Sequence, residues 1–351
     1  MKQDIRTYSP AQLTEWFKQN GEPAFRAKQV QEWLWKKSAR SFGQMSNLGV
    51  PLREKLDQQF VINALSVATE QRSTDGTIKS SFRLHDGNLV EGVLIPALRT
   101  DDQDRMTACV SSQVGCSLTC KFCATGYMDR KRNLDAAEIY DQVVEIDRQA
   151  RTTYDAPLTN IVYMGMGEPL LNYKNVLTSI DKITSPDGLG MSPKRITIST
   201  AGIAKMIKQL GDDGVKTNLA LSLHAANDAK RDQIMPINES NSLANLADAL
   251  NYFYRKTGTR VTFEYIVFYH FNDGVQDARE LYEFTKKVPA KVNIIEYNPI
   301  AEANFKNTDP QTLDKFAGYL EDRGVTVNIR RSRGKDIDAA CGQLAGKEKS
   351  A

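Results

Sequence analysis

The sequence predicts an α/β protein built around a partial, open barrel of six β/α units. From residue 105 onward, short apolar stretches with strand character alternate with amphipathic helical stretches, which is typical of a parallel sheet. Six units are too few to close an eight-fold barrel. Helix-start signals and two hairpin signals precede residue 105. We therefore expect an N-terminal helical accessory domain and a small antiparallel β extension before the barrel.

Residues 1–62 are predicted to form the helical accessory domain. Its first helix has Ser9 as a candidate N-cap and Pro10 at the first helical position. Two more helices are expected to begin near Pro23 and Pro51. Three tryptophans lie here among lysines and arginines, a mixture that can bind RNA, although aromatic residues at helical spacing also form cores. The sequence leaves RNA contact by this domain open.

Residues 63–98 are predicted to form a three-stranded meander that carries Glu91. Asp-Gly dipeptides at 75–76 and 86–87 are strong hairpin signals. Because side chains alternate between the faces of a strand, Glu91 shares its face with apolar residues. A carboxylate is costly there unless it is paired or protonated, and such a group suits a general base. The alternative, which the strand pattern alone favours, is an edge-strand carboxylate that faces water.

Residues 99–334 are predicted to form the barrel. Its strands are expected at residues 107–111, 160–164, 195–199, 217–222, 260–267 and 291–296, with a late strand at 325–329. Helices are expected between them, for example at 134–150, 242–256 and 275–287. In parallel α/β barrels the active site lies at the carboxyl ends of the strands. The loops that follow these strands are therefore where functional residues are expected.

Three cysteines with the spacing C-x3-C-x2-C follow the first barrel strand: Cys116, Cys120 and Cys123. Soft thiolates select zinc, copper(I) or iron–sulfur clusters. Three ligands would leave one iron of a four-iron cluster free to bind a small molecule. With Phe122 between the last two cysteines, the motif resembles the radical S-adenosylmethionine (SAM) signature, which makes the barrel one of the radical SAM type. A structural zinc site with a distant histidine and three metal-free buried thiols are the alternatives.

Polar residues follow the other strands on the same predicted rim. The Gly-Met-Gly-Glu-Pro motif at 165–169 follows the second strand; Gly167 would let the backbone approach a ligand closely, and Glu168 can accept hydrogen bonds from an ammonium group. The third, fourth and sixth strands are followed by Ser199, by Ser222, Leu223 and His224, and by Asn298. Their convergence predicts a site for an amino-acid ligand that carries a ribose.

Two further cysteines lie outside the motif. Cys109 is on the first barrel strand, and Cys341 is in residues 335–351, which are expected to form a flexible tail because of their glycines and polar end. A thiol in such a tail is a candidate nucleophile, although the tail alone favours an incidental exposed cysteine. The basic stretch at 330–335 can hold RNA phosphates nearby.

Five segments of the chain are similar to the RlmN family, whose members are radical SAM methyltransferases that place a methyl group on carbon 2 of adenosine in RNA. The segments are SSQVGCSLTCKFCATG, GMGEPLLN, LSLHAANDAKRDQIMPIN, YNP and RGKDIDAACGQLAG. The resemblance covers nearly the whole chain, and all five cysteines fall on family positions. It implies that Cys116, Cys120 and Cys123 hold a four-iron, four-sulfur (4Fe-4S) cluster. It also implies a SAM site made by Gly167, Glu168, Ser199, Ser222, Leu223, His224 and Asn298.

The resemblance also implies three catalytic residues. Cys341 accepts a methyl group from one SAM, and a radical derived from a second SAM activates this group for addition to adenine. Glu91 acts as the proton acceptor. Cys109 then resolves the protein–RNA adduct through a transient disulfide with Cys341. Such a route overcomes the low electron density of carbon 2, which makes direct attack on a SAM methyl group unfavourable.

The implied substrates are one adenosine of 23S ribosomal RNA at the peptidyl transferase centre and the adenosine 3′ of the anticodon in some transfer RNAs. We expect a monomer that receives electrons from a donor such as flavodoxin or ferredoxin. No apolar run approaches the length of a transmembrane helix, and the first residues lack the apolar core of a signal peptide. The expected location is therefore the cytoplasm, with no membrane partner. The net charge of +3 says little about partners.

Three rival functions remain at this stage. A methyltransferase of the Cfr type, which acts on carbon 8, shares the cysteine chemistry, but GMGEPLLN is more similar to the carbon-2 branch. A radical SAM enzyme that acts on a small molecule would need neither the basic stretch nor the pair Cys109 and Cys341. A zinc-stabilised RNA-binding protein is the rival from another class, and its purified form would be colourless rather than brown.

Overall fold

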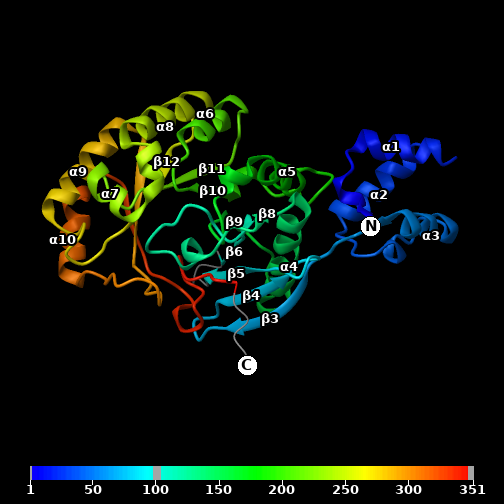
Figure 1. Ribbon diagram of the computed structural model, residues 1–351, viewed down its shortest axis with the longest axis horizontal. Helices are drawn as coiled ribbons and strands as arrows, with labels where there is room; N and C mark the ends of the chain where they lie inside the picture. The colour runs from blue at the N-terminus through cyan, green and yellow to red at the C-terminus, as the bar shows by residue number, and fades with distance from the viewer. Residues whose placement is uncertain (1, 98–103, 347–351) are drawn as a thin grey trace.

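A computed structural model describes residues 2–97 and 104–346 and has the predicted barrel at its centre (Figure 1). In the described residues, one sheet of ten strands has the order β14-β13-β12-β11-β10-β9-β6-β5-β4-β3. Neighbours from β6 to β14 pair in parallel. These strands are β6 (Arg105–Cys109), β9 (Asn160–Tyr163), β10 (Ile196–Thr200), β11 (Asn218–Ser222), β12 (Val261–Ile266), β13 (Ala290–Ile295) and β14 (Val327–Arg330). The six predicted barrel strands and the late strand are confirmed.

The predicted meander continues the same sheet. It consists of β3 (Ser66–Arg72), β4 (Ile78–Arg83) and β5 (Leu89–Ala97), and β5 pairs antiparallel with β6 so that Val93 lies opposite Cys109. Since β5 lies between β4 and β6, it is an interior strand. The alternative of an edge carboxylate facing water at Glu91 is therefore wrong, because this residue is only 3% exposed.

Amphipathic helices cover the outer side of the barrel, and Figure 1 shows α6, α8, α9 and α10 following one another around it. Their apolar faces pack on the strands; in α8, for example, Leu246, Leu250 and Phe253 are buried. The barrel helices are α4 (Ala136–Tyr154), α5 (Tyr173–Thr184), α6 (Ala204–Asp212), α7 (Asp228–Ile234), α8 (Leu243–Thr257), α9 (Val275–Lys287) and α10 (Pro310–Glu321). A two-stranded ribbon, β7 (Gln113–Val114) with β8 (Arg132–Asn133), flanks the cysteine loop.

The N-terminal helices stand to one side of the barrel (Figure 1). They are α1 (Pro10–Gln19), α2 (Phe25–Trp35) and α3 (Val50–Gln59), and the short strands β1 (Gln3–Asp4) and β2 (Phe60–Val61) pair at their base. Ser9 caps α1 as predicted, with its hydroxyl accepting from the backbone N–H of Gln12. Trp35 is buried against Tyr140 of α4, whereas Trp33 keeps an exposed part beneath the ammonium group of Lys37. The tryptophans therefore serve mainly as core, and RNA contact stays a prediction.

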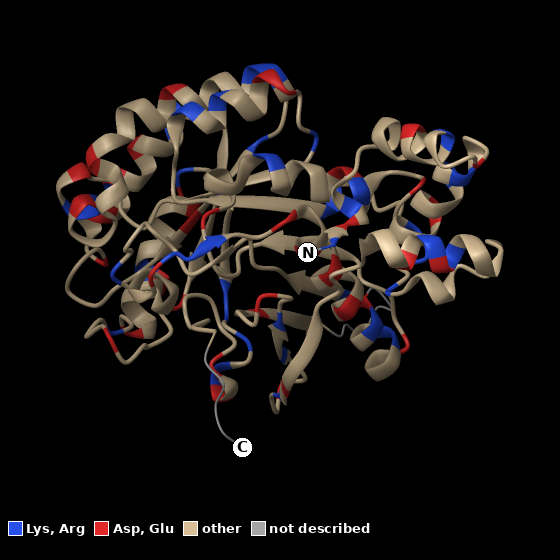
Figure 2. Cartoon of the chain, turned by 45° about the vertical axis from the view of Figure 1, so that its right-hand side comes forward, with Lys and Arg blue, Asp and Glu red and all other residues tan. Residues whose placement is uncertain are grey.

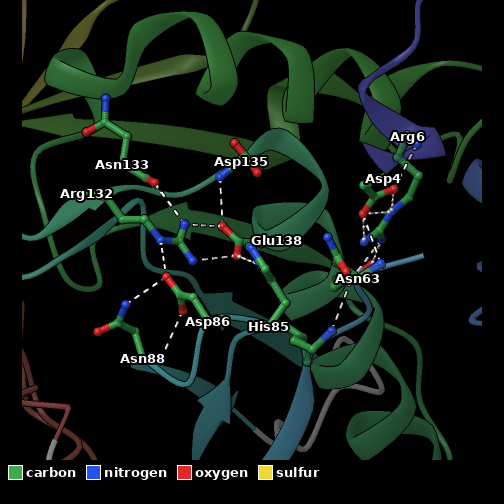
Figure 3. Close-up of polar contacts among 12 residues, drawn as sticks. Asp4, Arg6, Asn63, His85, Asp86, Asn88, Arg132, Asn133, Asp135 and Glu138 are labelled. Atoms are coloured by element: carbon green, nitrogen blue, oxygen red, sulfur yellow. Dashed lines mark hydrogen bonds and ion pairs between the residues drawn. The ribbon is translucent and has the colours of Figure 1, made fainter. Parts of the chain in front are cut away.

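Two hydrogen-bond networks, one around Arg6 and one around Arg132, connect the N-terminal segment and the β4–β5 hairpin to α4 (Figure 3). Arg6 binds Asp141 with Nη1 at 2.8 and 2.9 Å from the two carboxylate oxygens, and also pairs with Asp4. Arg132 forms two 2.8 Å hydrogen bonds to Glu138 and one of 2.6 Å to Asp86 in the hairpin between β4 and β5. The Arg132 hydrogen bond holds the pKa of Asp86 well below its usual range.

Residues 335–346 are packed against the protein, so the expected flexible tail is wrong for this part of the segment. The side chains of Ala339, Ala340 and Leu344 are buried. The backbone C=O of Gly342 accepts a 2.7 Å hydrogen bond from Ala124, next to the cysteine motif. Apolar residues between the polar ones thus give this segment a surface to bury, and the remaining five residues lie outside the described part of the chain.

Charges of both signs are interspersed over the outer helices (Figure 2). Several basic residues form ion pairs within the chain: Arg40 with Glu145, Arg132 with Glu138, and, in the basic stretch at 330–335, Lys335 with Glu296. In the described ranges, no helix is long and apolar enough to cross a bilayer.

We predict that Arg6→Met lowers the free energy of unfolding by about 3–5 kcal/mol, because it leaves Asp141 buried without its partner. Urea denaturation followed by circular dichroism measures this change. Arg72→Met is the matched control, since Arg72 pairs with Glu70 on the surface and should cost at most about 1 kcal/mol. Equal losses in the two variants would contradict a stabilising role for the buried pair.

Candidate active site

The cysteine loop lies between β7 and the short helical turn Ala124–Tyr127 and follows the carboxyl end of β6. Two glycines make its tight path possible. A Cβ atom on Gly115, whose φ is +74°, would lie 2.2 Å from the carbonyl oxygen of Asp129. One on Gly126 would lie 2.7 Å from that of Cys120. Close backbone packing of this kind positions the loop without any metal ion.

The three thiols of the motif line one cavity together with Glu168 and Cys341. Burial raises the pKa of all three, that of Cys116 to about 11. Thiolates here would thus be costly without a positive partner, which a metal centre supplies. In the described residues, no three His, Cys, Asp or Glu side chains meet closely enough for a single metal ion. The three cysteines line the wall of one cavity instead, and this suits a four-iron cluster, where each thiolate binds a different iron.

The Gly-Met-Gly-Glu-Pro loop follows β9 and forms the next part of the cavity wall. A Cβ atom on Gly167, with φ +94°, would lie 2.4 Å from the Gln113 side chain, so only glycine fits. The buried carboxylate of Glu168 accepts hydrogen bonds from the backbone N–H groups of Leu170 (2.9 Å) and Ala201 (2.8 Å). Burial raises its pKa. The Thr200 side chain forms a further hydrogen bond to this carboxylate. A carboxylate has about four acceptor positions, so one remains for a ligand ammonium group.

His224 follows β11 and reaches the cavity beside Ser199 and Ser222. Its Nδ1 accepts a 3.1 Å hydrogen bond from the backbone N–H of Ile266. Burial, helped by the nearby charge of Arg231, lowers its pKa to about 3. The imidazole is therefore neutral at physiological pH with its proton on Nε2, a donor suited to a carboxylate or hydroxyl.

Two residues of the predicted SAM site do not line this cavity with their side chains. Leu223 is fully buried in the hydrophobic core, and its backbone N–H and C=O bind Glu264 and Arg231. Asn298 is buried, and its Nδ2 donates to the backbone C=O of Cys341 at 3.1 Å. Among the residues that the structure describes, its Oδ1 finds no hydrogen-bond partner, so this amide retains an acceptor for a ligand.

The remaining cysteines lie near each other at the carboxyl end of β6. Cys341 keeps an exposed surface and lines the cavity of the cysteine motif. Cys109 is buried, and burial followed by the charge of Cys341 raises its pKa to about 12. Burial also raises the pKa of Cys341, against the charge of Arg330. Both thiols are thus protonated in this arrangement.

Glu91 lies in a different cavity, on the other side of residues 338–346. Its Oε2 accepts hydrogen bonds from the backbone N–H groups of Ala345 (2.8 Å) and Gly346 (3.2 Å), and its Oε1 is 3.4 Å from the ammonium group of Lys79. Since Cys341 and Gly342 line the first cavity and Gln343 and Ala345 the second, the docked segment separates the two.

Sequence reasoning missed three charged residues at these sites. Glu264 on β12 and Arg330 at the end of β14 line the cysteine cavity and lie 3.5 Å apart. Arg231 is fully buried and donates to the backbone C=O groups of Ala201, Ser222 and Leu223, which ties the ends of β10 and β11 together. Alternation along β12 could have placed Glu264 inside the barrel, whereas nothing local indicates that Arg231 is buried.

Comparisons with known proteins agree with this geometry. Residues 3–62 match the family described as ribosomal RNA large subunit methyltransferase N-terminal domain, and residues 110–284 match the radical SAM superfamily. The chain is 64% identical to the "Probable dual-specificity RNA methyltransferase RlmN" of Cytophaga hutchinsonii, covering 99% of this chain and 94% of that protein. It is 42% identical to the "Dual-specificity RNA methyltransferase RlmN" of Geotalea uraniireducens, covering 99% and 97%.

A solved structure is similar as well. The crystal structure of a radical SAM methyltransferase from Sphaerobacter thermophilus superimposes with a TM-score of 0.91 at 37% identity, covering 98% of this chain and 100% of that one. The likeness thus extends over the accessory domain, the β extension and the barrel.

We predict that Cys120→Ala abolishes stable iron binding, because two thiolates hold a cluster poorly. Anaerobic purification with iron and sulfide analysis should give about four irons per chain for the unchanged protein and little for the variant. Cys109→Ala is the control, since Cys109 lies outside the motif and should leave the iron content unchanged. Full iron content in the Cys120 variant would remove this residue from the ligand set.

Proposed function

The chain belongs to the RlmN family of radical SAM RNA methyltransferases, and we propose that it methylates carbon 2 of adenosine in 23S ribosomal RNA and in some transfer RNAs. It is an enzyme, and its cofactors are a 4Fe-4S cluster and SAM. One observation supports the proposal most directly. The three motif cysteines, the Gly-Met-Gly-Glu loop and the distant Cys341 line a single cavity at the carboxyl ends of the parallel strands.

In this proposal Cys116, Cys120 and Cys123 would hold the cluster, which would supply one-electron chemistry for generating a radical from SAM. The chain's own residues bind and orient SAM. Glu168 is held by two backbone N–H groups and accepts from the ammonium group, while His224 donates through Nε2. Ser199, Ser222 and the backbone of Gly167 line the same wall. Leu223 and Asn298 contribute through the backbone and through the free Oδ1, respectively.

In this proposal Cys341 accepts the methyl group, and its place in the wall of the same cavity as the cluster ligands supports that role. Arg330, which lines this cavity, opposes the rise of the Cys341 pKa caused by burial. Its guanidinium would therefore stabilise the thiolate when the proton leaves. Glu91 lies on the other side of the docked residues 338–346. This segment must therefore move before the methyl group on Cys341 can meet an adenine bound beside Glu91.

Cys109 is suited to resolving the adduct between protein and RNA. Its thiolate attacks the Cys341 sulfur and a sulfur–sulfur bond forms. The sulfur–carbon bond breaks with its electron pair left on carbon, which then takes up a proton as the new methyl group. Burial raises the pKa of Cys109 to about 12, so the thiol stays protonated in the docked arrangement. A protonated thiol is a poor nucleophile, so Cys109 can attack only after it has lost this proton.

The remaining parts of the proposal concern partners. The target adenosine must leave its base stack to enter a cavity at the carboxyl ends of the strands. The accessory domain and the exposed lysines and arginines would hold RNA phosphates. Arg330, however, pairs with Glu264 at 3.5 Å, which favours a role inside the site. We also propose a monomer that takes electrons from flavodoxin or ferredoxin in the cytoplasm, where its RNA substrates occur.

The proposal is tested by expressing the protein in a bacterial strain that lacks its own carbon-2 methyltransferase. Mass spectrometry of nucleosides from purified ribosomal and transfer RNA should show 2-methyladenosine in both. The Cys120→Ala variant is the control and should give none. Appearance of 8-methyladenosine instead would favour the Cfr type, and methylation of neither RNA would contradict the proposal.

We predict that Cys341 carries a methyl group when the active protein is isolated from cells. Its position in the wall of the cluster cavity supports this role. A peptide map by mass spectrometry should show a mass increase of one methyl group on the peptide containing Cys341. Cys120→Ala should lack it, because the cluster is lost. Active enzyme with only unmodified Cys341, also after incubation with SAM, would exclude this residue as the acceptor.

We predict that Cys109→Ala traps a covalent adduct between the protein and RNA. Without the second thiol, the sulfur–carbon bond to the base persists. Denaturing gels of the variant from cells should show a band shifted by attached RNA that nuclease removes. The double variant Cys109→Ala with Cys341→Ala should show no shift. Normal turnover of Cys109→Ala without attached RNA would remove Cys109 from the mechanism.

A further inference from the structure

The second cavity contains a buried lysine for which the proposed mechanism has no role. Lys79 on β4 is 6% exposed and lines this cavity together with Glu91, Asp338, Gln343 and Ala345. It lies diagonally across from Glu91, because Ser81 pairs with Glu91 and Lys79 with Val93 in the β4–β5 ladder. A lysine is rarely this buried unless it is paired, so its partners indicate what it does.

Lys79 contacts the predicted general base and the docked segment at the same time. Its ammonium group is 3.4 Å from Oε1 of Glu91 and donates to the backbone C=O of Asp338 at 3.3 Å. The other oxygen of Glu91 binds the backbone N–H groups of Ala345 and Gly346. Lys79, Glu91 and residues 338–346 therefore form one closed network.

We propose that Lys79 is a positioning residue that acts through Glu91. An ammonium group at this distance, carried by the neighbouring strand, restricts the Glu91 side chain to one orientation. When residues 345 and 346 leave, Oε2 loses its two donors, whereas the contact with Lys79 comes from the rigid sheet and stays. The Glu91 side chain thus stays aimed into the cavity at the moment the target adenine enters it.

The proposal rests on the proposed function, in which Glu91 is the proton acceptor. It makes a specific claim beyond that function, namely that Lys79 affects transfer to RNA and not methylation of Cys341. The reason is spatial, since Lys79 and Glu91 line the second cavity whereas Cys341 and the cluster ligands line the first.

The test compares Lys79→Met, which removes the charge at similar length, with Lys79→Arg, which keeps it. Reconstituted holoenzyme is assayed for Cys341 methylation by peptide mass spectrometry. Methylation of a 23S ribosomal RNA transcript that contains the peptidyl transferase centre is measured in parallel. We expect Lys79→Met to methylate Cys341 normally and to lower kcat for RNA roughly 10²-fold with little change in KM, within the range that general-base catalysis contributes. Lys79→Arg should restore a large part of the rate.

A double-mutant cycle shows whether Lys79 acts through Glu91. In a Glu91→Gln background, adding Lys79→Met should lower the RNA methylation rate no further. Lys208→Met, which removes an exposed lysine paired with Asp248 on the outer helices, is the matched control and should match the unchanged enzyme.

Three results would overturn the proposal: a normal RNA rate in Lys79→Met, additive losses in the cycle, or loss of Cys341 methylation together with RNA methylation. The last result would make Lys79 a residue needed only for folding. Failure of the unchanged enzyme to methylate the transcript would instead contradict the proposed function, so the two failures are distinguishable.

Discussion

The parallel alignment of β6 and β9–β14 is the constraint on which the rest of the structure depends. Parallel strands bring their carboxyl ends to one edge, so loops far apart in sequence meet there. The cysteine loop follows β6, the loop carrying Glu168 follows β9, and His224 follows β11. Arg231 then connects the ends of β10 and β11 by donating hydrogen bonds to three backbone carbonyl groups. The cavity is thus a consequence of topology, and its polar groups are held mostly by backbone hydrogen bonds.

Docking of residues 338–346 adds a second level of organisation. Hydrogen bonds from several elements hold the segment: Ala124 to Gly342, Thr125 to Leu344, Asn298 to Cys341, Lys79 to Asp338, and Glu91 to Ala345 and Gly346. One of them uses Glu91 itself, so the proposed base is occupied while the methyl carrier faces the cluster cavity. This arrangement would separate loading of Cys341 from its reaction with RNA.

Burial controls the charge state of almost every candidate residue. It raises the pKa of the motif thiols, of Glu168 and of both remaining cysteines, and it lowers that of His224. The same physical effect has different consequences. A buried thiol stays protonated unless a metal or a nearby cation stabilises the thiolate. A buried histidine is neutral and can donate a hydrogen bond. Two arginines oppose the effect of burial on thiols: Arg330 at Cys341 and Arg231 at Cys120.

The sequence by itself determined the order of elements, because hydrophobic alternation and turn residues are local signals. The strands, the cap at Ser9 and the motif spacing were all predictable in this way, as was the convergence of Glu168, Ser199, Ser222 and His224 on one rim. Local signals also indicated an apolar strand face around Glu91. They could not show that β5 is an interior strand, since this depends on its pairing with β6 across the start of the barrel.

Only the tertiary structure decided which partners the charged and tail residues find. The segment after residue 335 reads as polar and glycine-rich, yet Leu344 and two alanines find a surface to bury. Arg330 reads as part of a basic stretch, yet Glu264 from β12 lies 3.5 Å away. The side chain of Leu223 turns into the core although its neighbours line the cavity. Such outcomes depend on contacts between residues that are distant in sequence, and no local pattern encodes the free energy of those contacts.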